Sequence, residues 1–137
     1  MERFLVAQDE MYKIALSEIK EGYKESHWMW YIFPQIYGLG YSSKAKFYEL
    51  KSIEEAKKYI SNEVLRKRLI EISTVLYDLD GDIETILGSP DDLKFKSSMT
   101  LFYLVAPEYD IFKKNLDRYY NGYMCEHTVR VFEEENK

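Results

Sequence analysis

Two short segments of the sequence carry residue types that could bind a ligand or perform chemistry. The first is Ser26-His27-Trp28-Met29-Trp30, and the second runs from Lys94 to Phe102. Histidine changes charge more readily than other side chains near neutral pH, and the flanking apolar side chains would remove water from it. His27 could therefore act as a general base or as a hydrogen-bond donor to a ligand. It could equally be a core histidine with satisfied hydrogen bonds, and the sequence leaves both interpretations open.

The second segment predicts a helix that carries polar groups toward the interior. At 100° per residue, Lys94, Ser97 and Ser98 share one face of a helix that starts after Pro90. These groups need partners, because an unpaired buried ammonium group is very costly. In one interpretation, Lys94 pairs with Asp91 and the serines donate to the preceding turn of the helix. In the other, the three side chains face a cleft and bind an anion.

A third segment, Pro34 to Ser43, contains two glycines before a helix that is predicted to begin after Ser42. Backbone N–H groups at the start of a helix can meet a phosphate. The dinucleotide-binding fingerprint is incomplete, because Ser43 replaces its third glycine and no strand precedes it. An ordinary turn explains the segment more simply. Other signatures of catalysis are missing, and Lys94-x-x-Ser97 has the reverse order of the SxxK motif.

Helical periodicity predicts the elements that position these segments. Apolar residues recur at helical spacing over about residues 3–21, 53–62, 65–79, 82–87, 91–105, 107–120 and 124–134. Ser52 with Glu55 predicts a capping box, and Pro107 suits the first position of a helix. No convincing strand is present, although Trp28 to Phe33 could be extended. We therefore predict an all-α fold, a compact and irregular multihelical single domain over residues 1–137.

The composition excludes several classes of site and partner. The single cysteine, Cys125, cannot form an internal disulfide, and no His/Cys cluster has the spacing of a metal site, so neither a metal nor a cofactor is expected. The charged N-terminal segment and the lack of a long apolar run predict a cytoplasmic protein without a membrane partner. The net charge is −5 with no basic stripe, so no nucleic-acid partner is expected. The predicted state is a monomer or a weak homodimer. His127 is expected on the surface.

Distinctive residues extend over nearly the whole chain, namely Arg3-Phe4, Ala7-Gln8, Tyr12, Ser26-His27-Trp28-Met29-Trp30, Phe33-Pro34-Gln35, Gly38-Leu39-Gly40, Glu55-Ala56, Arg68-Leu69, Gly88, Asp91-Asp92, Lys94, Ser97 to Phe102, Leu116 to Tyr119 and Gly122. At these positions the chain resembles the domain of unknown function 1810 family. The resemblance implies a compact multihelical fold and suggests that the motif segments meet in space, but it carries no established reaction. The label "calpastatin" that members have received is not supported, since a calpastatin would be long, disordered and repetitive. The sequence departs from the family pattern at Tyr123 to His127.

These observations lead to one functional hypothesis and two alternatives. The hypothesis is a small-molecule binding protein or hydrolase, whose cleft lies between the Ser26–Gln35 segment and the helix from Lys94 to Phe102. An anionic, nucleotide-like ligand such as an ADP-ribose derivative suits cationic, hydroxyl and aromatic groups together. Hydrolysis of a glycosidic or phosphate ester bond is the reaction class to test. The first alternative is a non-enzymatic protein–protein interaction domain that uses the aromatic segment. The second is that the motifs are purely structural and hold the fold together, with the function elsewhere. The predicted catalytic residues are His27, Lys94 and Ser98, and the predicted ligand-binding residues are Ser26, Trp28, Trp30, Gln35, Asp91 and Ser97.

Overall fold

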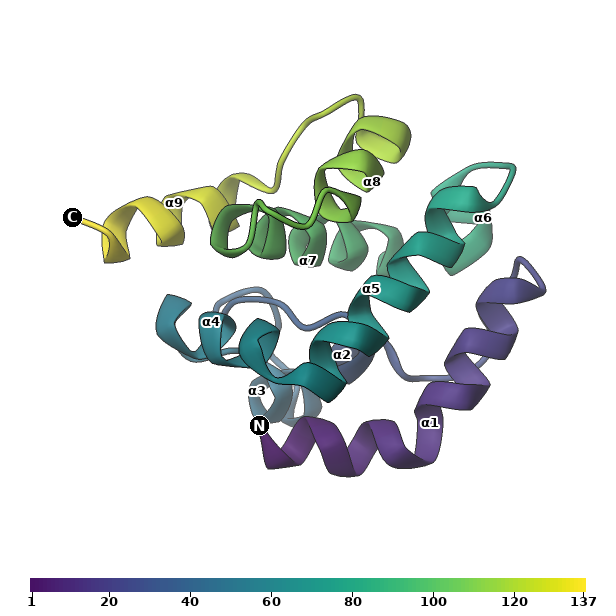
Figure 1. Ribbon diagram of the computed structural model, residues 1–137, viewed down its shortest axis with the longest axis horizontal. Helices are drawn as coiled ribbons and strands as arrows, with labels where there is room; N and C mark the ends of the chain where they lie inside the picture. Colours follow the sequence, from purple (N-terminus) through teal and green to yellow (C-terminus); the bar gives the residue numbers. More distant parts are fainter.

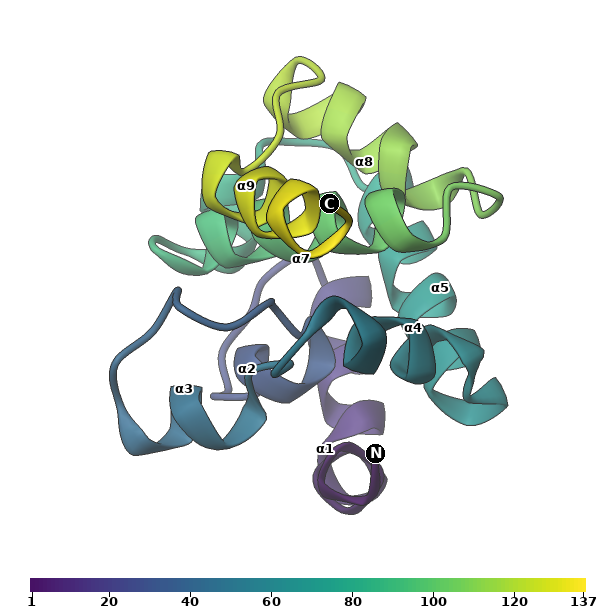
Figure 2. The same cartoon turned by 90° about the vertical axis from the view of Figure 1, so that its left-hand side faces the viewer.

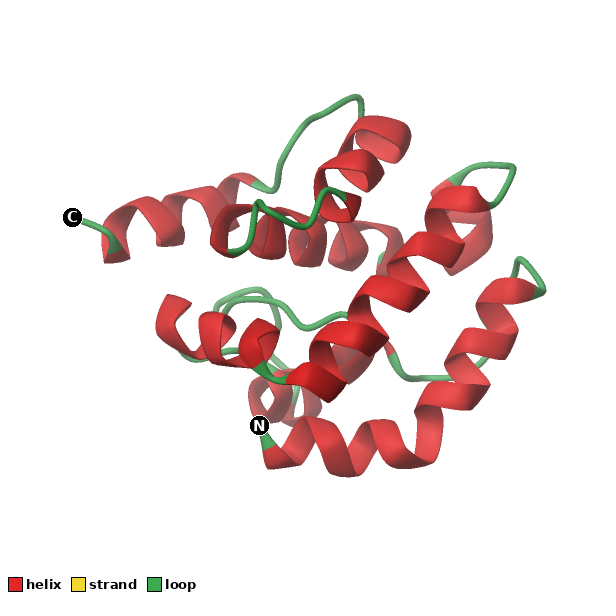
Figure 3. Ribbon diagram, viewed as in Figure 1, coloured by secondary structure: helices red, strands yellow, loops and turns green.

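The computed structural model describes residues 1–137, which form nine α-helices and no strand (Figure 3). The predicted all-α fold is thereby confirmed. An isolated bridge between Ile36 and Leu50 is the only β-type pairing. The helices, in chain order, are α1 Glu2–Lys20, α2 Met29–Ile32, α3 Ser43–Tyr48, α4 Ile53–Ser61, α5 Glu63–Asp78, α6 Ile83–Leu87, α7 Asp91–Val105, α8 Ile111–Tyr120 and α9 Glu126–Glu135.

The helices form two groups joined by α5 (Figures 1 and 2). Helices α7, α8 and α9 lie together on one side, and α1 to α4 lie on the other. Helix α5 runs obliquely between them and contacts α1, α4 and α8. This arrangement brings the segment between α1 and α2 toward the start of α7, although more than 60 residues separate them in the chain.

Helix α7 is the central helix of the fold. It contacts α4, α6, α8 and α9, and every residue from Phe95 to Phe102 except Lys96 is buried. A helix that is apolar on most sides is expected in the interior, because each side finds a packing partner there. The Phe95 ring meets Phe33 edge-on, with ring centroids 4.9 Å apart, and Phe33 also contacts Trp28 at 6.2 Å. An aromatic core therefore lies directly behind the first turn of α7.

Three local expectations need correction. The segment from Trp28 to Phe33 is not extended, because Met29–Ile32 forms the short helix α2. Pro107 does not begin a helix, since α8 starts at Ile111 after a turn. Ser52 caps α4 as predicted, with its hydroxyl accepting from the Glu55 N–H at 3.0 Å, but the Glu55 carboxylate accepts from the Lys51 N–H instead of from the cap residue. None of the helices combines the length and apolar character of a membrane span.

Candidate functional site

The loop between α1 and α2 is held in place by one carboxylate, Glu18. It accepts hydrogen bonds from the backbone N–H groups of Glu25 and Ser26, both at 2.9 Å, and from the Ser26 hydroxyl at 2.5 Å. It also accepts from the indole Nε1 of Trp28 at 2.9 Å. Burial alone would raise the pKa of Glu18, but the hydrogen bonds from Ser26, Glu25 and Trp28 outweigh burial and lower the pKa to about 2. Sequence reasoning missed Glu18, because no motif marks an acid in the last turn of a helix as the acceptor for the loop that follows.

Asp91, at the start of α7, bridges two lysines. Its Oδ2 lies 2.8 Å from Lys24 Nζ, and its Oδ1 lies 3.1 Å from Lys94 Nζ. The pairing of Lys94 with Asp91, one of the two interpretations drawn from the sequence, is confirmed. Burial would raise the pKa of Asp91, yet the hydrogen bonds and charges of the two lysines outweigh burial, so the pKa is lowered. The two ammonium groups are thus fixed on either side of one carboxylate.

Trp30 forms the apolar side of the same site. The Lys94 Nζ lies 4.1 Å from the centroid of its ring, which is a close cation–π contact. The far end of the indole passes under Gly40, where an added Cβ would lie 2.7 Å from Trp30 Cη2 and 2.6 Å from Ala45 Cβ. A glycine is therefore needed at position 40 because the backbone packs closely against Trp30. This packing explains Gly40 better than a phosphate-binding turn does.

These residues line an open pocket of about 410 Å³. Three segments supply its walls: the loop before α2 with α2, the start of α3, and the first turn of α7. The side chain of His27 is exposed, and its ring makes no hydrogen bond to the protein, while the Lys44 ammonium group donates to the His27 carbonyl at 3.4 Å. The lining residues are Lys24, His27, Met29, Trp30, Ser42, Lys44, Asp91 and Lys94.

The structure divides the predicted site residues into three sets. His27, Trp30, Asp91 and Lys94 meet at the pocket, as the hypothesis of adjacent segments requires. Ser26 lies in the loop beside it and is bound to Glu18. The remaining four, Trp28, Gln35, Ser97 and Ser98, are buried and do not line the pocket.

The two serines illustrate why the buried set does not reach the pocket. Ser97 donates to the Leu93 carbonyl at 3.1 Å, as expected for a serine that bonds back to the preceding turn. Ser98 is fully buried and its hydroxyl has no hydrogen-bond partner. Both lie on the part of α7 that has already entered the core. The prediction that they face a cleft with Lys94 is therefore not met by this geometry.

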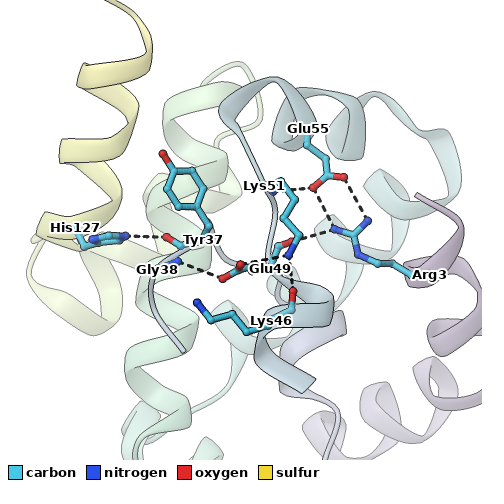
Figure 4. A network of polar contacts seen from close by, with 8 residues as sticks. All are labelled: Arg3, Tyr37, Gly38, Lys46, Glu49, Lys51, Glu55 and His127. Carbon is cyan, nitrogen blue, oxygen red and sulfur yellow. Dashed lines mark hydrogen bonds and ion pairs between the residues drawn. The ribbon is translucent and has the colours of Figure 1, made fainter. Parts of the chain in front are cut away.

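The middle of the Pro34–Ser43 segment, at Tyr37 and Gly38, is tied to α9. His127 Nε2 lies 2.8 Å from the Tyr37 carbonyl oxygen, and the ring is half-buried against Gly38, so His127 is not the free surface residue that was expected (Figure 4). The Tyr37 hydroxyl donates to Glu135 at 3.0 Å. The Gly38 N–H donates to Glu49 at 3.2 Å. These contacts fix the segment that leads into α3 and so the wall that carries Ser42 and Lys44.

The fold and the pocket define a small all-α protein with a cationic, tryptophan-lined hollow. The chain belongs to the family described as "Protein of unknown function (DUF1810)", whose model matches residues 1–132. A crystal structure of the conserved hypothetical protein Rv1873 from Mycobacterium tuberculosis is similar, with 40% sequence identity and a TM-score of 0.92 over 95% of this chain and 94% of that chain. A search of the curated proteins found no match.

Proposed function

We propose that this protein binds a small phosphate-containing, nucleotide-like ligand, such as an ADP-ribose derivative, in the pocket between α2, α3 and α7. The observation that carries the proposal is the charge of the pocket. Three lysines and one aspartate line it, although the chain as a whole has a net charge of −5. A hollow of about 410 Å³ falls within the range of about 300–1,000 Å³ that small-molecule sites occupy.

The arrangement of the lysines supports binding of an anion. Asp91 takes one donor from each of Lys24 and Lys94, and the Lys24 ammonium group also donates to the Ser26 carbonyl at 2.6 Å. An ammonium group has three donors, so Lys94 keeps two for a ligand. Lys44 has no carboxylate partner within ion-pair distance. A phosphate group would supply the acceptors that these donors lack.

The aromatic and imidazole groups would receive the rest of such a ligand. Trp30 is half-buried and offers an apolar surface next to the lysines, while His27 has both ring nitrogens free of protein partners. Of the three predicted catalytic residues, Lys94 is paired with Asp91 and Ser98 is sealed in the core. For hydrolysis of a glycosidic or phosphate ester bond, His27 is then the group best placed to transfer a proton. Its ring has no orienting partner, so binding is the better supported function.

The experiment is a binding titration with ADP-ribose, AMP and inorganic pyrophosphate, by calorimetry and thermal shift. We expect Lys94→Ala and His27→Ala to remain folded and Lys94→Ala to weaken binding by about 10- to 100-fold, the range expected for a lost charge-assisted hydrogen bond. Lys113→Ala is the matched control, since this exposed lysine pairs with Asp117 far from the pocket in the chain. Absence of binding by all three probes, or equal weakening by Lys113→Ala, contradicts the proposal.

The alternative function, a protein-interaction surface built on the aromatic segment, has less support. Trp28, Tyr31 and Phe33 are buried, and Trp30 is the only aromatic side chain from Trp28 to Phe33 that is not. The segment therefore presents no broad aromatic face to a partner.

A further inference from the structure

Helix α3 and the residue before its cap present two aromatic rings to solvent. Tyr41 is 90% exposed and Phe47 is 56% exposed, whereas most aromatic side chains of this protein contribute to the core. Phe47 is held in place by an edge-on contact with Tyr48 at 4.9 Å, and Tyr48 packs against Tyr31 at 5.1 Å. The Phe47 ring is thus connected to the interior through Tyr48 but remains accessible to solvent.

Cationic side chains surround these rings. Lys44 and Lys46 form no ion pair, and the Lys46 ammonium group lies 5.9 Å from the Tyr41 ring. Arg3 and Lys51 lie on the same side of α3 as Lys46 (Figure 4). Arg3 is 18% exposed and donates to both carboxylate oxygens of Glu55, so its charge is paired, whereas Lys51 is 55% exposed and lies 3.3 Å from Glu49. A hollow of about 540 Å³ is lined by Arg3, Ser43, Lys46, Phe47 and Lys51.

This hollow and the pocket of the proposed function lie next to each other along α3. Ser42 and Lys44 line the pocket, and Ser43 and Lys46 line the hollow. The two together gather cations from positions 3, 24, 44, 46, 51 and 94 around α3. The carboxylates that pair with these cations are fewer, namely Asp91, Glu49 and Glu55. A cationic surface thus forms on an acidic protein from segments that are separate in the sequence.

We propose that the α3 surface, defined as Tyr41, Lys44, Lys46 and Phe47 with Arg3 and Lys51, binds single-stranded nucleic acid. Proteins bind single strands by placing cations along the phosphates and aromatic rings against the bases. Each nucleotide of a single strand carries one anion and one flat ring, which is the combination that this surface offers. Paired bases of a duplex are stacked on one another and cannot meet the exposed rings, so a single strand is favoured.

This inference revises the expectation, drawn from the sequence, that no nucleic acid binds. That expectation rested on the absence of a continuous basic stripe in the chain, and the folded surface provides cations without such a stripe. The inference can be tested apart from the proposed small-molecule function, because Tyr41, Lys46 and Phe47 do not line the pocket between α2, α3 and α7, whereas Lys44 belongs to both sites.

The test is fluorescence anisotropy of a labelled oligothymidine of about 12 nucleotides, within the range of single-strand site sizes, at about 50 mM salt and above. We expect saturable binding that weakens with salt, with a log–log slope of about −1.4 to −2 for two to three phosphate contacts. Tyr41→Ala and Phe47→Ala should each weaken binding by roughly tenfold, the lower end of the loss for one stacked base. Lys46→Glu should reduce both the affinity and the salt slope.

Two control variants and two competitors make the outcome decisive. Tyr123→Ala removes a ring that is 71% exposed in the segment before α9, and Lys113→Glu reverses a charge on α8; both should bind as the wild type does. Unchanged melting temperatures show that the variants are folded. Absence of binding, equal loss in the control variants, or equal competition by a duplex or by an acidic peptide of the same charge overturns the inference. Phe47→Ala should still bind ADP-ribose as the wild type does, because Phe47 does not line the pocket between α2, α3 and α7.

Discussion

The pocket and the aromatic core behind it share the same two segments but use them in opposite ways. Trp28 and Trp30 are two residues apart, yet Trp28 is fully buried, with its indole bound to Glu18, while Trp30 lies at the pocket under Lys94. In α7, Lys94 faces the pocket and the next residue, Phe95, is fully buried. Neighbouring residues of one motif therefore face either the core or the pocket. Changes on the core side should lower stability, and changes on the pocket side should alter ligand affinity.

The largest expected effect is on the core side, at Phe95. We expect Phe95→Ala to lower the free energy of unfolding by about 3–5 kcal/mol, because it leaves a cavity and removes the edge-on contact with Phe33. Urea denaturation measures the change. Leu93→Ala is the control, since Leu93 is 55% exposed on the same helix and should cost less than about 0.5 kcal/mol. Similar losses for both variants would contradict the division between core and pocket.

The next effect concerns Glu18, which connects the two regions. Glu18→Gln should cost about 2 kcal/mol at neutral pH, because the loop loses charge-assisted hydrogen bonds. The pKa of Glu18 is lowered from 4.5 to about 2 in the folded protein, so its contribution is complete above about pH 4.5 and is lost as the pH falls toward 2. The difference in stability between the wild type and Glu18→Gln should therefore shrink over this range in denaturation experiments. A difference that is independent of pH would show that Glu18 does not hold the loop as a carboxylate.

Gly40 tests how the pocket side is packed. Its backbone does not have a positive φ, so Gly40→Ala acts through contact alone, and the new methyl group would clash with Trp30 and Ala45. Overpacking of this kind costs about 1–3 kcal/mol and should displace the indole. We expect a shifted tryptophan fluorescence spectrum and weaker ADP-ribose binding. An unchanged spectrum together with unchanged affinity would mean that Gly40 does not position Trp30.

The smallest change in stability is expected at Asp91, where the sign of the affinity change is the useful result. Asp91→Asn removes the only carboxylate of the pocket, so the affinity for an anionic probe such as pyrophosphate should rise severalfold. Stability should fall by about 1 kcal/mol, because Lys24, whose side chain is only 8% exposed, exchanges a charged hydrogen-bond acceptor for a neutral one. Calorimetry and denaturation measure the two quantities. Weaker binding of pyrophosphate would show that Asp91, and not the lysines, organises the ligand.

The helices were largely predictable because their signals are local. The start of α7 after Pro90, the Ser52 cap of α4 and the end of α8 at Asn121 all follow from residues within one turn of the feature. The pairing of Lys94 with Asp91 was predictable for the same reason, since three residues along a helix bring two side chains together. The start of α8 was not, because Pro107 suits a turn as well as a helix.

The composition of the pocket could be predicted only in part. Helical geometry gives the relative directions of Lys94 and Ser98 but not the depth at which α7 enters the core, so Ser98 was expected at a cleft and is buried. Lys24 and Lys44 meet the start of α7 through packing of distant segments, which no local pattern records. Glu18 does not line the pocket but binds the neighbouring loop. Most cations of the α3 surface are close in the sequence, at positions 44, 46 and 51, but the exposure of Tyr41 and Phe47 beside them depends on the fold.

The most direct test of the account uses the two indole groups in one NMR experiment. ADP-ribose is titrated into ¹⁵N-labelled protein, and the Nε1–H signals of Trp28 and Trp30 are followed. We predict a saturable shift of the Trp30 signal that Lys94→Ala weakens, while the Trp28 signal, whose donor is bound to Glu18, stays nearly constant. No shift of the Trp30 signal, or saturable shifts confined to residues far from α2, α3 and the start of α7, would contradict the proposed site.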